Sequence, residues 1–181
     1  MTKRHVVIMN GVGGQGVLVA GELLVKSAVR AYSFALYSPL YGSARRGGFS
    51  ECVVSFSNDE VASPWISKAD TVVVFEASKI LSCEGKVLPG GTLITETTGL
   101  KDSLKRTDIK VVKVPAIQSA LDMGSGKVNN IIMLGACVKV SNSIDPKIVE
   151  EEIAKGFGQK FLEDNLKAFR EGMRLASVGY V

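Results

Sequence analysis

The sequence is poor in the residues that most enzymes use for metal binding and acid–base chemistry. It has one histidine, His5, and three cysteines, Cys52, Cys83 and Cys137, which show no C-x-x-C spacing. This pattern excludes a histidine-based triad, a zinc site and an iron–sulfur cluster held by this chain alone. We expect the cysteines to be small buried residues in a reducing compartment, and His5 to lie at a strand edge or on the surface.

Long apolar runs and a strong charge of one sign are also absent. No stretch of about 18 apolar residues occurs, and the first residues run directly into a strand pattern, so we expect no membrane span, no signal peptide and a cytoplasmic location. The net charge is +4, with acidic and basic residues interspersed, which predicts no nucleic-acid interface and no membrane anchor. The length of 181 residues and the hydrophobic content of 46% fit a single globular domain, residues 1–181.

A glycine-rich turn lies close to the start of the chain. The β-branched run 6–8 precedes Gly11-Val12-Gly13-Gly14-Gln15-Gly16, and an apolar helical pattern follows. This G-x-G-x-x-G spacing predicts a Rossmann-like start, in which amide groups at the beginning of the helix favour an anion. However, residues 31–37 lack the acidic residue that binds a dinucleotide ribose about 20 positions further on. An NADP site and a turn that binds nothing both stay open.

Strand and helix patterns alternate along the rest of the chain. We predict strands at residues 51–57, 71–76, 92–95 and 109–114, and helices at 63–66, 77–82, 116–123, from 129, at 147–155 and at 159–173. Residues 38–50 are expected to form a polar loop, and residues 89–91 a turn. Asp145 and Pro146 are typical of a helix start. The alternation predicts a single three-layer, doubly wound α/β domain with a mainly parallel sheet.

A second set of polar and glycine residues is expected near the first turn, at the carboxyl edge of the sheet where open α/β sheets bind ligands. It consists of Tyr41, Gly42, Arg45, Arg46, Gly47 and Gly48. Either arginine could bind a carboxylate or phosphate in a bidentate manner, or pair with nearby acids in a solvated turn. Asn129 and Asn130 are further candidates, unless one of them caps the helix that follows. Glu76 either faces the cleft or forms a surface salt bridge.

Several segments, taken in order, resemble one known family. GVGGQGV, SPLYGSARRGG, SECVVSFSNDEVASP, KADTVVVFE and VNNIIMLGA cover nearly the whole chain. Together they resemble the gamma subunit of the 2-oxoacid:ferredoxin oxidoreductases. The arginine-glycine-glycine form is more similar to the 2-oxoglutarate and branched-chain members than to the pyruvate members. Arg46, directly before Gly47, matches the single arginine of related sequences better than Arg45 does.

The resemblance implies a complex that oxidatively decarboxylates a 2-oxoacid, transfers the acyl group to coenzyme A and reduces ferredoxin. Thiamine diphosphate, Mg²⁺ and 4Fe–4S clusters would lie on partner alpha, beta and delta subunits, since this chain lacks motifs for all three. The gamma subunit would be inactive alone, with no catalytic residue and no cofactor of its own. It would pack on the thiamine-binding subunits, with coenzyme A at the subunit interface.

Three alternatives accompany this interpretation. The chain could be a stand-alone NADP-binding protein, because its glycine turn is followed by arginines, or a non-catalytic assembly protein whose glycine loops are structural. In isolation it could also form a homodimer. Trp65 and the region around Tyr41 are the expected contributors to an apolar interface.

Overall fold

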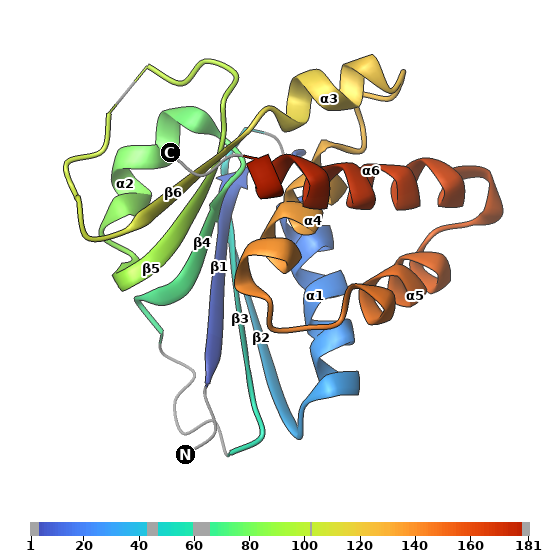
Figure 1. The fold of residues 1–181 in the computed structure, drawn as a ribbon, viewed down its shortest axis with the longest axis horizontal. Coiled ribbons are helices and arrows are strands. Elements are labelled where there is room, and N and C mark those ends of the chain that lie inside the picture. Colours follow the sequence, from blue (N-terminus) through green and yellow to red (C-terminus); the bar gives the residue numbers. More distant parts are fainter. Residues whose placement is uncertain (1–3, 43–46, 60–65, 102, 179–181) are drawn as a thin grey trace.

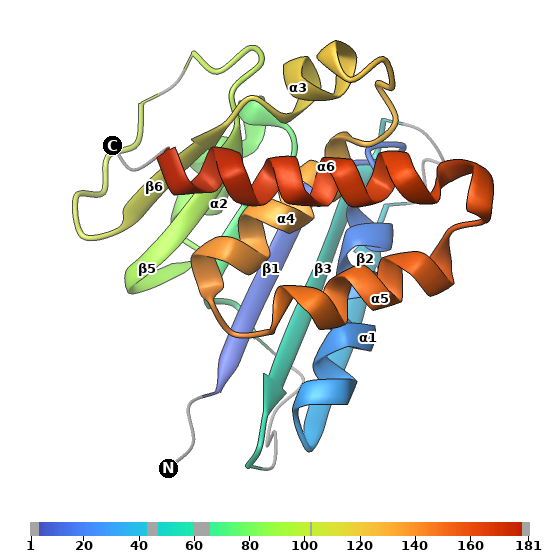
Figure 2. The same ribbon diagram turned by 45° about the vertical axis from the view of Figure 1, so that its right-hand side comes forward.

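The computed structural model describes residues 4–42, 47–59, 66–101 and 103–178, and shows a six-stranded sheet with helices on both faces (Figures 1 and 2). The strands are β1 (His5–Val12), β2 (Phe34–Tyr41), β3 (Phe49–Ser57), β4 (Ala69–Val74), β5 (Val87–Glu96) and β6 (Lys110–Val114). The helices are α1 (Val17–Ala31), the 3₁₀ turn η1 (Ala77–Lys79), α2 (Ile80–Glu84), α3 (Ala116–Asp122), α4 (Asn129–Ser141), α5 (Pro146–Gly156) and α6 (Gln159–Val178).

The sheet has the strand order β2-β3-β1-β4-β5-β6. Strand β1 is parallel to β4, β4 to β5 and β5 to β6, whereas β3 is antiparallel to both β1 and β2. The run β1–β4–β5–β6 buries Val72 and Leu93 completely, as expected of parallel strands that are covered on both faces. The α/β class and the mainly parallel sheet predicted from the sequence are therefore confirmed.

Strand β2 contradicts the polar loop predicted for residues 38–50. Residues 38–41 continue β2 and residues 49–50 begin β3, so the connection is a hairpin rather than a long loop. Pro39 in this segment argues against a strand when the sequence is read alone. Because β2 is at the edge of the sheet, a proline costs no ladder bond on its free side.

The two faces of the sheet are covered unequally (Figure 1). Helices α1, α4, α5 and α6 bury the larger core on one face, with Met9, Val54 and Ile94 pointing into it. The other face carries a smaller core around Ile8, under α2 and the segment 97–109. The predicted three layers are present, but one of them is thin.

Helix α4 is buried around its whole circumference, because every residue from 130 to 138 is buried. It lies between the sheet and α6, which crosses over it (Figure 2). At the crossing, a Cβ on Gly135 would lie 2.1 Å from the Phe169 carbonyl oxygen, and one on Gly172 would lie 1.9 Å from that of Ile132. Only glycine permits this close approach of the two backbones.

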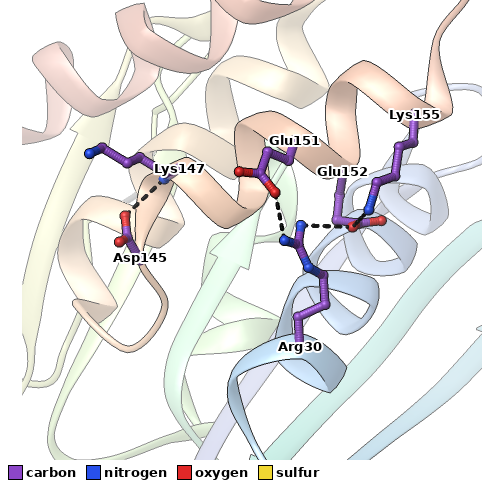
Figure 3. Close-up of polar contacts among 6 residues, drawn as sticks. All are labelled: Arg30, Asp145, Lys147, Glu151, Glu152 and Lys155. Atoms are coloured by element: carbon purple, nitrogen blue, oxygen red, sulfur yellow. Dashed lines mark hydrogen bonds and ion pairs between the residues drawn. The ribbon is translucent and has the colours of Figure 1, made fainter.

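Helix α5 is attached to α1 by a group of charged side chains (Figure 3). Arg30 forms ion pairs with Glu151 and, at 3.0 Å, with Glu152. The Glu152 carboxylate also accepts a hydrogen bond from Lys155 at 2.8 Å. The hydrogen bond from Lys155 and, to a smaller extent, that from Arg30 lower the pKa of Glu152 below its usual value. The carboxylate is thereby kept ionised while its side chain is only 10% exposed.

Other local predictions can now be compared with the structure. Asp145 caps α5 by accepting the Lys147 amide at 2.9 Å, as predicted (Figure 3). The turn predicted at residues 89–91 is wrong, because these residues lie within β5, next to an irregular pairing with β4. Of the helix predicted at 63–66, only Ile66 belongs to the described residues, and it is not helical. Within the ranges given above, no helix has the length and apolarity needed to cross a membrane.

Candidate functional site

The glycine turn joins the end of β1 to the start of α1 at the carboxyl edge of the parallel strands. Gly16 is the N-cap residue of α1 with φ of 74°, and Gly14 has φ of 100°. Both lie in the backbone region that favours glycine. A Cβ on Gly16 would also lie 2.5 Å from the side-chain nitrogen of Asn130. The turn thus needs glycine at this position for two reasons, the backbone angle and the space.

The side chain of Gln15 folds back over the turn. Its Oε1 accepts the Val12 amide at 3.0 Å, and its Nε2 donates to the Glu76 carboxylate at 2.8 Å. A Cβ on Gly11 would lie 2.6 Å from the same Oε1, so Gly11 provides the space for this conformation. Glu76 therefore faces the turn, the first of the two alternatives considered for it. The Val12, Gly13 and Gln15 amides are all hydrogen-bonded within the protein, and a carboxylate lies nearby, so the amides of this turn are poorly suited to binding the pyrophosphate of a dinucleotide.

An open pocket of about 570 Å³ lies against this turn, and we call it the turn pocket. Its lining consists of Gly14, Gln15, Gly16, Ile117, Gly126, Lys127, Asn129 and Asn130. The fold thus brings three of the predicted glycine-turn residues, Gly14, Gln15 and Gly16, and the two predicted asparagines to one place. Lys127 was not predicted. Its position between Gly126 and the asparagine pair is the only sequence signal that could have indicated it.

The two asparagines belong to the first turn of α4 and do not cap it. Val128 occupies the N-cap position, and no side chain makes a capping bond there. Asn129 Oδ1 instead accepts the Asn130 amide at 2.9 Å, and Asn130 Nδ2 donates to the Gly16 carbonyl at 3.3 Å. The capping prediction is therefore wrong, because the helix begins at Asn129 itself, earlier than a cap at either asparagine requires. The Asn130 bond ties the start of α4 to the glycine turn.

The predicted contact between the two glycine-rich segments is confirmed. The Gly13 amide donates to the Gly48 carbonyl at 2.7 Å, and the Gly47 amide donates to the Gly13 carbonyl at 3.3 Å. Between the two strands of the hairpin, the Gly42 amide donates a hydrogen bond to the Phe49 carbonyl at 2.9 Å. Arg45, Arg46, Trp65 and the side chain of Tyr41 lie outside the described residues, so the roles predicted for them stay predictions.

A second pocket of about 320 Å³ lies beside the same hairpin, and we call it the basic pocket. It is lined by Asn10, Val12, Gly47, Phe49, Lys79, Ser82 and Lys86. Lys79 and Lys86 of this pocket were not predicted from the sequence. Their spacing of seven positions is no usable helical signal, because α2 ends at Glu84 and Lys86 lies beyond it.

The cysteines have no nucleophilic or metal-binding character in this fold. All three are buried, and burial raises the pKa of the Cys52 and Cys137 thiols to about 12. Such thiols stay protonated and unreactive at neutral pH. Among the residues that the structure describes, no group of three or more His, Cys, Asp or Glu side chains could hold a metal ion.

Comparison with known families identifies the chain. The family model described as pyruvate ferredoxin/flavodoxin oxidoreductase matches residues 6–175, which include the turn and both pockets. The chain belongs to this family. Membership agrees with the family resemblance stated from the sequence segments.

Individual members of the family vary in length. The chain is 31% identical to the ketoisovalerate oxidoreductase subunit VorA of Methanothermobacter marburgensis, over 90% of this chain and 34% of VorA. It is 29% identical to the 2-oxoglutarate synthase subunit KorC of the same organism, over 93% of this chain and 95% of KorC. The chain thus spans about a third of VorA and nearly all of KorC.

A solved structure shares the fold. The 2-oxoglutarate:ferredoxin oxidoreductase from Magnetococcus marinus, determined with 2-oxoglutarate, coenzyme A and succinyl-CoA bound, has a TM-score of 0.88 at 22% identity. The match covers 98% of this chain and 32% of that chain. The fold described above therefore forms one part of a longer chain in that structure.

Proposed function

We propose that this chain is the gamma subunit of a 2-oxoacid:ferredoxin oxidoreductase and works only together with other chains. The enzyme would oxidatively decarboxylate a 2-oxoacid, transfer the acyl group to coenzyme A and pass the electrons to ferredoxin. The observation that carries this proposal is the family match across residues 6–175. KorC, a relative of nearly the same length, is by name a subunit of a 2-oxoglutarate synthase.

The cofactors of such an enzyme do not fit the residues of this chain. A 4Fe–4S cluster needs four thiolates, whereas this chain has three cysteines in all and burial raises the pKa of each. Magnesium prefers carboxylate and carbonyl oxygens, and no acidic cluster that could hold it occurs in the described ranges. We therefore assign thiamine diphosphate, Mg²⁺ and the clusters to partner alpha, beta and delta subunits.

The turn pocket is the part of this chain that we propose to face coenzyme A at the subunit interface. Its single charged residue, Lys127, is exposed and suits an anionic ligand, and the asparagine side chains offer amide donors and acceptors. Gly11, Gly13, Gly14, Gln15 and Gly16 would shape its floor, and Gly42, Gly47 and Gly48 would support them through the hairpin bonds. Arg46 remains our candidate for an anion or partner contact, with Arg45 as the weaker one.

Reconstitution tests this proposal. The chain alone, supplied with thiamine diphosphate, Mg²⁺ and coenzyme A, should show no 2-oxoacid oxidation. Added to thiamine-binding and cluster-bearing subunits that lack their own gamma chain, it should restore 2-oxoacid-dependent reduction of ferredoxin. Full turnover by the partner subunits without this chain would overturn the proposal.

Two substitutions separate the remaining alternatives in the same assay. Arg46→Ala should lower turnover about tenfold, the loss of one charge-assisted hydrogen bond, and Arg46→Lys should recover only part of it, because lysine lacks the planar fork of arginine. Lys113→Ala, on the exposed side of β6, is the matched control and should leave turnover unchanged. Wild-type activity of both Arg46→Ala and Lys127→Ala in an assembled complex would favour a purely structural subunit.

A further inference from the structure

Glu96 is a buried carboxylate at the carboxyl end of β5, at the same edge of the sheet as the turn pocket. Only 1% of the residue is exposed. Its carboxylate accepts hydrogen bonds from the Thr97 amide at 2.9 Å, the Thr98 amide and hydroxyl at 2.8 Å each, and the Ile117 amide at 2.9 Å. Within the described ranges, no lysine or arginine pairs with it. These four donors therefore replace the water that burial removes from the charge.

The two oxygens of this carboxylate bind different segments of the chain. Oε1 accepts all three bonds from residues 97 and 98, which directly follow β5, whereas Oε2 accepts only the Ile117 amide. Ile117 lies in the first turn of α3, and the N-cap residue of that helix, Pro115, makes no side-chain capping bond. Glu96 supplies this cap from the neighbouring strand, and a carboxylate suits the free amides at the start of a helix.

Helix α3 and the loop that joins it to α4 form one side of the turn pocket (Figure 1). Ile117 lines the pocket from the helix, and Gly126 and Lys127 line it from the loop. The amides of residues 124 and 125 donate to carbonyl groups of α3 at 2.8 and 2.9 Å, so the loop is bonded to the helix. The position of Lys127, the only charged residue in this lining, therefore depends on where α3 lies.

We propose that Glu96 is a positioning residue, which holds α3 so that Ile117 and Lys127 form the wall of the turn pocket against coenzyme A. This inference rests on the proposed function, which supplies coenzyme A as the ligand. Glu96 itself is not part of the pocket lining. It acts on the pocket only through α3 and the loop that follows.

The need for two acceptor oxygens explains why a charge is buried at this position. Glutamine has nearly the same shape and is easier to bury, but its amide group has one acceptor oxygen and two donor hydrogens. When that oxygen stays with the three donors of residues 97 and 98, the NH₂ group faces the Ile117 amide, donor against donor. Glu96→Gln should therefore release α3 selectively while the end of β5 keeps its bonds.

Hydrogen exchange of the full chain tests the link to α3. In Glu96→Gln the amides of α3 should exchange at least about tenfold faster than in the wild type, because a bond to a charged acceptor is lost. Glu84→Gln is the matched control, since this buried carboxylate accepts the Lys105 and Arg106 amides through Oε1 alone. Its amide oxygen can keep both bonds, so exchange in α3 should stay at the wild-type rate. Equal protection of α3 in the wild type and in Glu96→Gln would overturn the proposal.

Kinetics of the assembled enzyme test the effect on the pocket. In Glu96→Gln the KM for coenzyme A should rise about tenfold with kcat unchanged, the loss of one charge-assisted contact to Lys127, whereas Glu84→Gln should keep the wild-type KM. In a Lys127→Ala background, Glu96→Gln should change KM by less than about twofold, because both substitutions remove the same contact.

The outcomes separate this proposal from the proposed function. An unchanged KM in Glu96→Gln, an equal rise in Glu84→Gln, or effects of Glu96→Gln and Lys127→Ala that multiply would refute the positioning role and leave the gamma-subunit proposal intact. A wild-type complex that shows no 2-oxoacid oxidation refutes the proposed function instead. The exchange rates of α3 in the chain alone then still decide whether Glu96 holds this helix.

Discussion

Replacing Gly16 by alanine should destabilise the domain through two separable effects. The residue has φ of 74°, and an L-residue in that region costs roughly 1–2 kcal/mol relative to glycine. The new Cβ would also lie 2.5 Å from Asn130 Nδ2, so the asparagine must move and lose its bond to the Gly16 carbonyl, worth about 0.5–1.5 kcal/mol. We expect a total loss of about 2–3 kcal/mol, which lowers Tm by roughly 4–12 °C in a domain of this length.

A double-mutant cycle isolates the steric part. In an Asn130→Ala background the contacts of 2.5 Å with Nδ2 and 2.8 Å with Cγ disappear and only that of 3.0 Å with Cβ remains. Gly16→Ala should then cost mainly the backbone part, and the coupling between the two sites should be about 1 kcal/mol. Gly14 is the matched control, because its φ is 100° and nothing lies within 4 Å of an added Cβ. Gly14→Ala should therefore be additive with Asn130→Ala.

Urea unfolding followed by circular dichroism measures all four stabilities for each cycle. Equal coupling of Asn130→Ala to Gly14→Ala and to Gly16→Ala, within about 0.3 kcal/mol, would show that the asparagine does not pack against the turn. The link between α4 and the floor of the turn pocket would then be wrong.

Further predictions concern the helix crossing, the charged cluster and dinucleotide binding. Gly172→Ala should lower the free energy of unfolding in urea by about 3 kcal/mol or more, because its Cβ meets a backbone oxygen that cannot move alone. Gly85 is the control, since it has a helical φ and open space around it, and Gly85→Ala should be neutral or slightly stabilising. Equal effects of the two substitutions would contradict the close crossing. The lowered pKa of Glu152 means that its contribution to stability is present above about pH 4.3, the value for an unfolded glutamate, and is lost as the pH falls through its folded pKa. Urea midpoints at successively lower pH should therefore fall less steeply in Glu152→Gln than in the wild type, and parallel curves would refute this. Calorimetric titration of the chain with NAD and with NADP should show no binding in the low micromolar range, about −8 kcal/mol, and such binding by either cofactor would restore the stand-alone dinucleotide interpretation.

The parts of the fold that local chemistry dictates could be predicted from the sequence. The continuous apolar run of β4 and the apolar helix α4 are recognisable because burial on all sides leaves few polar residues. The cap at Asp145 was predictable because one side chain and one following proline determine it. Strand β2 was missed, because its status depends on its place at the sheet edge, which residues 34–41 do not encode on their own.

The candidate site also combines residues that local sequence patterns predict with residues that only the fold brings together. Gly11 to Gly16 were predicted from their spacing. Their contact with Gly47 and Gly48 was predicted because both segments were expected at the carboxyl edge of the sheet. The basic pocket was not predicted, because it needs β1, β3 and α2 to be placed side by side. The pairing of Gln15 with Glu76 also joins residues 61 positions apart, and no local pattern specifies such a partner.

The crossing of α6 over α4 bears on how the protein is made. A ribosome completes the six strands by residue 114 and α4 by residue 141, but the helix that covers α4 ends only at residue 178. At about 5–20 residues per second, the intervening chain takes roughly two to seven seconds to synthesise. During that interval a largely apolar helix lacks its outer layer, so the nascent chain presents a surface for chaperones or for premature association. Synonymous codon changes that slow translation after residue 141 should therefore lower the soluble yield without altering any residue of the finished protein.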